Sequence, residues 1–300
     1  MRTIQEKGGN WMVGSSLTAA MLLVTASAHA QNDDFASVQI VPHDIAGKVH
    51  YLEGRGGNIG LLIGDEGVVM VDDQFAPLTD KIVAAIRTMT DKDIRFLINT
   101  HVHPDHTGGN ANFAGLGVPI VAHDNVRNRM VQGIRGNPPE PVAARPIVTY
   151  GDTMKMHIDG EEIEIVKAPP AHTDGDSLIF FKTSNVMHTG DVFRTGAFPV
   201  IDTANGGTAK GTIAALKLAL EMVEPDTAIL PGHGQVSTPA DLQKFLDMVV
   251  DVEARVSALV DQGMTLEQVI AAKPTAAYDD AGLGSPERFI TGLYESLKSE

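Results

Sequence analysis

Residues 100–110 read THVHPDHTGGN, which places three histidines and an aspartate within six consecutive positions. The whole chain of 300 residues has only 11 histidines, so this stretch concentrates a scarce residue type. The apolar run Ile94–Ile98 comes just before it and predicts a buried strand that leads into the cluster. Gly108 and Gly109 follow, and they allow a sharp turn into a helix. The pattern therefore predicts a polar site at the end of a strand.

The spacing within this stretch favours metal binding. Alternate residues of an extended chain point the same way, so His101 and His103 can share one metal ion. Asp105 and His106 lie beyond the turn-favouring Pro104 and can reach a second ion. Imidazole and carboxylate groups suit zinc, and also iron or manganese.

Three further candidate ligands lie far along the chain. His172, Asp191 and His233 each follow a predicted strand and stand beside glycine or proline in the segments PPAHTDG, HTGD and PGHG. A single histidine of this kind is more often structural. The joint pattern of strand end, turn residue and metal-capable side chain favours a two-metal site.

The secondary-structure pattern predicts two blocks of strands, each followed by helix. Two such blocks in one chain suggest two sheets packed face to face with helices outside, which is an α/β, four-layer αββα arrangement in a single domain. The expected strands are residues 38–41, 49–53, 58–64, 67–72, 94–98 and 118–121 in the first block, and residues 154–158, 162–166, 177–181, 186–188 and 228–230 in the second. The expected helices are residues 78–90, 211–223, 242–259, 266–272 and 286–297. Residues 135–146 contain four prolines, which indicates either a loop over a site or a connector.

Residues 1–30 have the pattern of a secretory signal peptide. Arg2 and Lys7 precede a short apolar stretch, and Ala28-His29-Ala30 gives the small-x-small pattern of a cleavage site. The apolar stretch is shorter than a membrane span requires, although an uncleaved anchor is the alternative. We therefore expect a mature chain of residues 31–300, one domain, in the periplasm or secreted, and not membrane-bound after cleavage.

Composition narrows the chemistry and the partners. The chain has no cysteine, which excludes disulfides and thiolate ligands and suits an oxidising compartment. Its formal net charge of −15 argues against nucleic acid and anionic membranes. A small-molecule substrate is the partner that we expect.

The joint motifs resemble those of the metallo-β-lactamase superfamily. The segment HxHxDH at residues 101–106, His172 in AHTDGDS, Asp191 in TGD and His233 in PGHG match its ligand motifs in order, from about residue 58 to residue 234. Asp72-Asp73 resembles the first motif, an aspartate that ends an early strand. The resemblance implies an αββα sandwich of the metallo-β-lactamase type that carries a dinuclear site.

The resemblance also implies roles for these residues. One metal ion would take His101, His103 and His172, and the other would take Asp105, His106 and His233. Asp191 would bridge two zinc ions, and a metal-bridging hydroxide would be the nucleophile. Asp105 is then the expected catalytic residue, which orients the hydroxide and passes its proton to the leaving group.

The substrate is less constrained than the fold. His103 favours zinc and hydrolysis, since diiron flavoproteins of this fold carry Glu there. Export favours a hydrolase of cyclic amides or esters, with a β-lactam as the leading substrate. Asp191 departs from the β-lactamases, which place Cys or Ser near this position, and it resembles lactonases and thioesterases of the glyoxalase II type. A mononuclear iron enzyme like the persulfide dioxygenases is a further alternative, as is a non-catalytic binding protein.

Overall fold

Two separate sheets account for the two blocks of strands. The computed structural model describes Thr3 and residues 35–299. Residues 39–300 cluster into one compact unit. The expected signal peptide, residues 1–30, lies outside the described residues apart from Thr3. Within the described part of the chain, no helix is both long and apolar enough to span a membrane.

The first sheet has seven strands in sequence order. Strands β1 to β4 form an antiparallel meander, and β4 to β7 run parallel with helical connections between them. The strands are β1 (Val41–Ala46), β2 (Val49–Glu53), β3 (Ile59–Gly64), β4 (Gly67–Val71), β5 (Ile94–Ile98), β6 (Ile120–His123) and β7 (Val148–Tyr150).

The second sheet has five strands in the order β12-β11-β10-β9-β8. Neighbours are antiparallel except β11 and β12, which are parallel. The strands are β8 (Thr153–Ile158), β9 (Glu161–Lys167), β10 (Ser177–Phe181), β11 (Val186–His188) and β12 (Ala228–Leu230).

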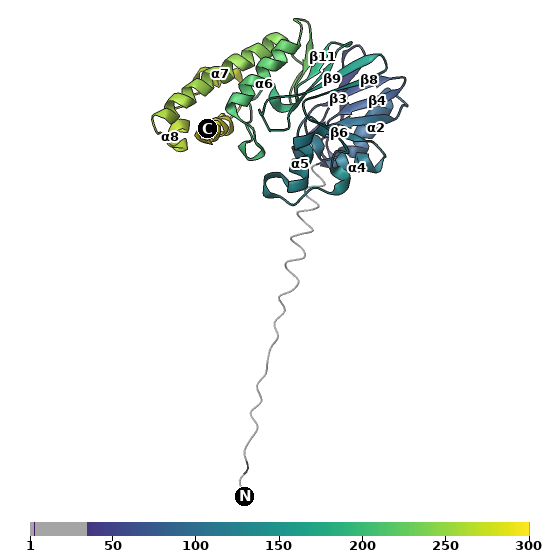
Figure 1. The fold of residues 1–300 in the computed structure, drawn as a ribbon, viewed down its shortest axis with the longest axis horizontal. Helices are drawn as coiled ribbons and strands as arrows, with labels where there is room; N and C mark the ends of the chain where they lie inside the picture. Colours follow the sequence, from purple (N-terminus) through teal and green to yellow (C-terminus); the bar gives the residue numbers. More distant parts are fainter. Residues whose placement is uncertain (1–2, 4–34, 300) are drawn as a thin grey trace. The chain divides into compact units, whose positions relative to one another are not determined.

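Helices cover the outer faces of both sheets (Figure 1). The α-helices are α2 (Thr79–Met89), α3 (Pro104–Thr107), α4 (Asn110–Gly115), α5 (Asp124–Gln132), α6 (Ala209–Met222), α7 (Pro239–Asp261), α8 (Leu266–Ala271) and α9 (Glu287–Ser299). Single 3-10 turns are η1 (Ala76–Leu78), η2 (Ile134–Gly136), η3 (Val142–Ala144), η4 (Gly190–Val192) and η5 (Thr203–Asn205), and η6 (Ala276–Ala281) is longer.

The core between the sheets draws apolar side chains from both. Val69 and Ile98 of the first sheet meet Ile165 and Ile179 of the second in one fully buried cluster. Each such side chain contributes roughly 1.5–3 kcal/mol on burial. Strands β4 and β10 are buried along their whole length, as expected for strands covered on both faces, whereas β9 alternates between buried and partly buried residues.

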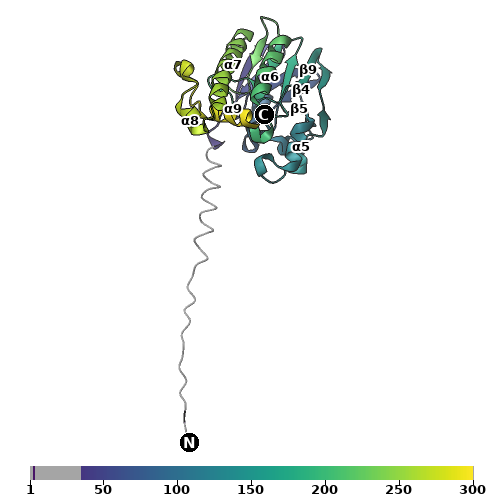
Figure 2. The same cartoon turned by 60° about the vertical axis from the view of Figure 1, so that its left-hand side comes forward.

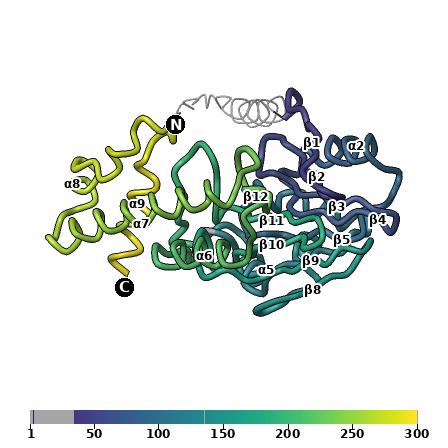
Figure 3. Tube along the Cα trace, turned by 90° about the horizontal axis from the view of Figure 1, so that it is seen from above, coloured from purple at the N-terminus to yellow at the C-terminus, as the bar shows by residue number. Residues whose placement is uncertain are grey.

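A second core lies between the second sheet and the C-terminal helices. Leu178 and Met187 on the sheet pack with Leu216 of α6, Val249 of α7 and Leu293 of α9. Helices α6 and α7 run side by side in two views (Figures 1 and 2), and Figure 3 shows them beside β10 to β12 while α2 lies by the first sheet. The expected αββα sandwich is confirmed.

The differences from the sequence-based expectation lie at weakly patterned segments. The expected strand at residues 38–41 is wrong except for Val41, since β1 covers Val41–Ala46. This edge strand is largely exposed and contains Pro42, so its sequence has no strong apolar pattern. Helix α5 and strand β7 were not expected, since α5 is mostly polar and β7 has three residues. Residues 135–146 connect these two elements.

Candidate metal centre

The candidate ligands all lie at one edge of the sandwich. Strand β10 is antiparallel to both β9 and β11, and β11 is parallel to β12, so β9, β11 and β12 end at the same edge. His172, Asp191 and His233 follow these three strand ends. The first sheet meets the second at this edge, because the Ser177 amide donates to the Thr100 carbonyl at 2.9 Å. This contact brings the end of β5, and His101 after it, to the same place.

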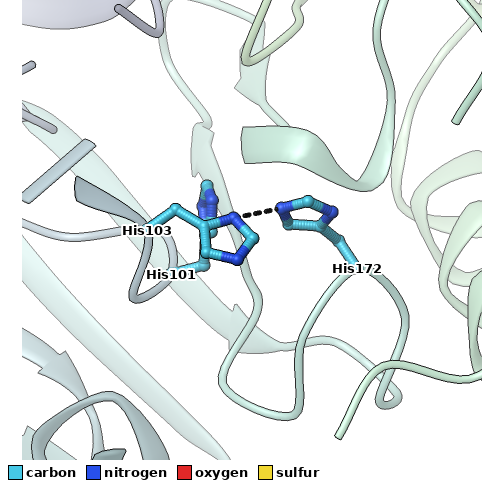
Figure 4. A group of neighbouring side chains, drawn as sticks. All are labelled: His101, His103 and His172. Carbon is cyan, nitrogen blue, oxygen red and sulfur yellow. Dashed lines mark hydrogen bonds between the residues drawn. The ribbon is translucent and has the colours of Figure 1, made fainter. Parts of the chain in front are cut away.

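One group contains three buried histidines: His101, His103 and His172. Figure 4 shows the rings of His103 and His172 joined through their nitrogens, with His101 beside them. His172 Nε2 lies 2.7 Å from His103 Nδ1, and the two ring planes are nearly perpendicular, at 85°. The Nε2 atom of His101 is buried and has no hydrogen-bond partner among the described residues. Three imidazole nitrogens within 4.8 Å of one another match the needs of a single metal ion.

Hydrogen bonds on the far side of each ring fix which nitrogen faces the site. His103 Nε2 lies 2.6 Å from Asp202 Oδ2, and His172 Nδ1 lies 2.7 Å from the Val200 carbonyl. Each nitrogen that donates to such an oxygen leaves the other free to act as an acceptor or ligand. The loop after Asp191 therefore orients two rings of this group.

A second group contains Asp105, His106 and His233. His233 Nε2 lies 3.2 Å from Asp105 Oδ2 and 3.3 Å from His106 Nε2. His106 is fully buried, and its Nδ1 lies 2.7 Å from Asp72 Oδ2. Asp72 thus orients His106 as Asp202 orients His103.

Asp72 has a strained backbone. Its φ of 64° lies in the left-handed region, which costs a residue with a side chain about 1–3 kcal/mol. The Thr100 amide and hydroxyl both donate to its carboxylate, at 2.8 and 2.7 Å, and these bonds offset the strain. The Thr100 side chain also lies 3.0 Å from His101 Nδ1, so one network supports a histidine of each group.

Asp191 lies between the two groups. Its Oδ1 is 3.3 Å from His106 Nε2, while its Oδ2 is 3.4 Å from His233 Nε2 and 3.6 Å from His172 Nε2. Oδ1 is buried without a hydrogen-bond partner in the described part of the chain. One carboxylate therefore reaches histidines of both groups, which is the position of a bridging ligand.

Burial and the crowded charges shift the pKa values in opposite directions. Burial lowers the pKa of His101 well below its ordinary value, and the neighbouring His106 adds to this effect. Burial alone would lower the pKa of His106, but the Asp191 and Asp72 carboxylates raise it well above normal. For Asp191, His106 and His233 outweigh burial and hold the pKa well below its ordinary value. The Asp191 carboxylate is thus poised to stay charged and to attract a cation.

The donor set fits divalent metal ions. Two buried atoms, His101 Nε2 and Asp191 Oδ1, lack partners among residues 35–299, and unpaired buried polar atoms are costly unless a ligand completes them. Imidazole and carboxylate ligands without thiolate suit zinc, iron or manganese. All seven predicted ligands meet here.

A pocket of about 300 Å³ opens onto this site. Its wall contains candidate ligands from both groups together with two arginines and two apolar residues; the lining is His103, Pro104, Asp105, His172, Asp191, Arg194, Val200, His233 and Arg288. A larger hollow of about 620 Å³ beside α2 includes none of the seven predicted ligands, so chemistry rather than size assigns the site.

Several polar and aromatic residues near the site lie outside both ligand groups. Nε2 of the buried His188 lies 3.1 Å from the Asn58 carbonyl oxygen, and His188 belongs to neither group of candidate ligands. Phe193 and Phe198 pack in the core between the second sheet and the C-terminal helices, whereas Val200 lines the pocket. Arg145 donates to the Glu140 carbonyl. For the stretch at residues 135–146, the lining of this pocket includes no residue from 137 to 146.

Sequence reasoning missed Asp202, Val200 and Arg288. Asp202 has a weak local signal, because it caps a turn and accepts from the Asn205 amide group at 2.7 Å, an Asx pattern readable as D-x-x-N. Arg288 has no such signal, since only the packing of α9 brings it to the pocket.

The sequence matches a known family over most of this region. The model of the metallo-beta-lactamase superfamily matches residues 52–233. The chain is 29% identical over 135 residues to the 2,4-dinitroanisole O-demethylase subunit alpha of Nocardioides sp. (strain JS1661), covering 44% of this chain and 40% of that protein. It is 31% identical over 169 residues to a hydroxyacylglutathione hydrolase of Nitrosococcus oceani, covering 55% and 57% respectively. These matches span about half the length of the curated relatives.

Solved structures show the same fold. A metallo-beta-lactamase from Pontibacter korlensis aligns with a TM-score of 0.62 at 19% identity, covering 71% of this chain and 100% of that one. The sec-alkylsulfatase Pisa1 from Pseudomonas sp. aligns with a TM-score of 0.67 at 18% identity, covering 88% of this chain and 51% of that one. Since the family model spans more than half of the sequence and the sandwich agrees with it, the chain belongs to the metallo-β-lactamase superfamily of metal-dependent hydrolases.

Proposed function

We propose that this protein is an exported dizinc hydrolase that opens a cyclic amide or ester, with a β-lactam as the leading substrate. The observation that carries the proposal is the position of Asp191, whose carboxylate reaches His106 on one side and His172 on the other. A carboxylate between two sets of three ligands supports two metal ions rather than one.

His101, His103 and His172 would hold one zinc ion, and Asp105, His106 and His233 the other. When bound, zinc supplies Lewis acidity, which polarises a carbonyl oxygen and lowers the pKa of water. The chain itself orients the ligands: Asp202 fixes the ring of His103, and Asp72 fixes the ring of His106. Substrate would enter through the 300 Å³ pocket, where Val200 and Pro104 provide the apolar wall.

Asp105 is our choice for the proton-transfer residue. Its Oδ2 faces the pocket 3.2 Å from His233 Nε2. Burial would raise the pKa of its carboxyl, but the hydrogen bond with His233 and the charge of His106 hold it below the ordinary value. It is therefore charged at neutral pH, which lets it accept a proton from the attacking water and pass it to the leaving nitrogen or oxygen.

A thioesterase is the second candidate. The relatives from Polaromonas sp. and Nitrosococcus oceani, 29% and 31% identical, are named hydroxyacylglutathione hydrolases. Asp191 in place of Cys or Ser also favours this reading. A thioester resembles an ester more closely than it resembles an amide. The same residues would therefore serve the hydrolysis of both esters and thioesters.

The test combines metal analysis with turnover. We expect two zinc ions per chain by elemental analysis, and β-lactam ring opening that is lost with chelator and in Asp105→Ala. Turnover of a lactone or thioester without a β-lactam would replace the leading substrate by the second candidate. One iron per chain with oxygen consumption on a persulfide would contradict a hydrolase.

Export needs its own measurement. Expression of the full chain in a Gram-negative host should give a periplasmic product whose first residue is Gln31. A product that retains Met1 in the cytoplasm would contradict export and would leave the hydrolase proposal standing.

A further inference from the structure

We infer that Arg129 of helix α5 is a positioning residue for the candidate metal centre, because its side chain ties together the two turns that support His172 and His103. This inference rests on the proposed function, since it names a residue that prepares the same group of ligands. In the described part of the chain, the side-chain hydrogen bonds of Arg129 end on Asp174 and Ala204 and not on a candidate ligand. Arg129 would therefore act only through the turns that it holds.

The turn that contains His172 depends on helix α5. Asp174, two residues after this ligand, accepts from Arg129 Nε at 3.3 Å and from Arg129 Nη2 at 2.7 Å. Such paired donors match the two oxygens of a carboxylate and fix its orientation. Asn125, one helical turn earlier on α5, donates to the Asp174 carbonyl at 2.9 Å. Two side chains of one helix thus hold both the carboxylate and the backbone of Asp174.

The same guanidinium reaches the turn that begins at Asp202. Its Nη1 donates to the carbonyl of Ala204, within η5, at 3.2 Å. Asp202 directly precedes η5, and its carboxylate is the group that orients His103. One arginine side chain therefore links the turn after β9 to the turn that supports a second ligand.

Backbone hydrogen bonds join the two turns side by side. The Asp174 amide donates to the Asn205 carbonyl at 2.9 Å, and the Asp202 amide donates to the His172 carbonyl at 2.9 Å. The Asn205 side chain in turn donates to the Asp202 carboxylate at 2.7 Å. A shift of Asp174 would therefore pass through Asn205 to the carboxylate that orients His103.

Helix α5 is itself fixed beside the site, so it can serve as the support. Val126 and Met130 pack in a buried cluster with Val102, the residue that stands between two of the candidate ligands. The helix also approaches the turn of His172 closely, because a Cβ on Gly175 would lie 2.9 Å from a methyl carbon of Val126. Helix α5 thus borders both segments that supply the three-histidine group.

Two roles for this arginine predict different measurements. An ion pair that only stabilises the fold would lower the melting temperature and leave metal affinity unchanged. A positioning residue would lower the affinity of one metal ion and alter the surroundings of the histidines on its side of the site. Partners that orient metal ligands typically act in the second way.

The first experiment measures zinc affinity by competition with a chromophoric chelator. We expect Arg129→Gln to bind one of its two zinc ions roughly 10-fold more weakly than the wild type. Arg129→Lys keeps the charge but loses the paired donors, so we expect it to lose affinity as well. If Arg129→Gln does not fold, Arg129→Lys takes its place in each comparison.

Arg127→Gln is the matched control for this experiment. Arg127 lies on the same helix, but its guanidinium donates to the Pro146 carbonyl instead. Its replacement removes an arginine and a hydrogen bond of α5 without touching Asp174 or Ala204, and it should leave zinc affinity unchanged. Wild-type affinity in the Arg129 variants, or an equal loss in Arg127→Gln, overturns the inference.

The second experiment is independent of metal and of turnover. Nuclear magnetic resonance of the metal-free protein, isotope-labelled at the histidine nitrogens, reports the tautomer and hydrogen bonding of each ring. We expect Arg129→Gln to shift the ring-nitrogen signals of His103 and His172 and to leave those of His106 and His233 in place. Unshifted signals of His103 and His172, or equal shifts at all four histidines, overturn the inference.

The two proposals fail in different ways. A zinc-loaded protein that turns over neither a β-lactam, nor a lactone, nor a thioester contradicts the hydrolase, while the zinc affinities still decide on Arg129. A protein that carries iron in place of zinc contradicts the proposed metal, and the histidine spectra of the metal-free protein then decide. An active hydrolase whose Arg129 variants bind zinc as the wild type does keeps the proposed function and loses the positioning role.

Discussion

The carboxylate of Asp202 lies 2.6 Å from Nε2 of His103, on the side of the ring that faces away from the other candidate ligands. Both side chains are buried. Asn205 donates to the same carboxylate oxygen at 2.7 Å, so Asp202 is itself held in place. This arrangement fixes the ring so that Nδ1 points to His172.

Replacing Asp202 by Asn should weaken metal binding at the group that contains His103. Loss of the carboxylate removes the partner that sets the ring orientation, and such losses cost about 10- to 100-fold in metal affinity. Zinc competition with a chromophoric chelator measures the effect. Asp279→Asn, an exposed aspartate in η6, is the matched control and should bind zinc as the wild type does. Equal affinities in both variants would show that Asp202 does not position the ligand.

Gly232→Ala should disturb the bridging position. A Cβ at Gly232 would lie 2.0 Å from Asp191 Oδ1 and 2.7 Å from the Gly190 backbone, so the carboxylate or the backbone must shift. We expect fewer than two zinc ions per chain and a lower Tm. Gly115→Ala, at the end of α4 with open space around it, should leave both quantities nearly unchanged. Full zinc occupancy in Gly232→Ala would be evidence against a bridge formed by Asp191.

Removing metal should destabilise the fold. Five histidines and two aspartates crowd one edge of the sandwich, and a bound cation offsets the repulsion between the carboxylates and gives the histidine nitrogens a partner. Zinc at a hundredfold excess over its Kd would add about 2.7 kcal/mol, which raises Tm by roughly 5–10 °C in a chain of this size. Thermal melts with chelator and after zinc addition check this, and identical melting curves would speak against a metal in the folded state.

Asp176 should make stability depend on pH. Burial raises its pKa to about 6, although His172 and the hydrogen bonds from Thr173 act in the opposite direction. Because the folded-state pKa exceeds the ordinary 3.8, the folded state binds this proton more tightly, and stability is lost as pH rises from about 4 to about 6. The Asp176→Asn variant should escape this loss, which amounts to roughly 3 kcal/mol. Urea unfolding of both metal-free proteins across this range measures the difference, and a constant difference would refute the assignment.

The sequence predicted which seven side chains meet at this edge because each belongs to a local motif. His101 to His106 follow one strand, and His172, Asp191 and His233 follow others, so strand ends and turn residues were enough to mark them. The sandwich was predictable for the same reason, since the buried strands have strong apolar runs. The polar helix α5 and the short β7 carry no such pattern, and tertiary packing alone selects them.

The parts of the site that were missed depend on long-range packing. Val200 and Arg288 reach the pocket only because the loop after Asp191 packs on α9, a contact between segments about ninety residues apart that no local pattern encodes. The fold also separates Arg194, which lines the pocket, from Arg145, which donates to the Glu140 carbonyl within its own loop.

The origin of the pocket wall on α9 has an evolutionary consequence. All seven candidate ligands lie within residues 52–233, the part shared with the family, whereas Arg288 comes from beyond it. Substitutions in α9 can therefore change what the protein accepts and leave the ligand set untouched. Relatives of this chain that differ in substrate preference should accordingly differ first in the sequence of the C-terminal helix. Exchanging that helix between two such relatives should exchange their substrate preferences.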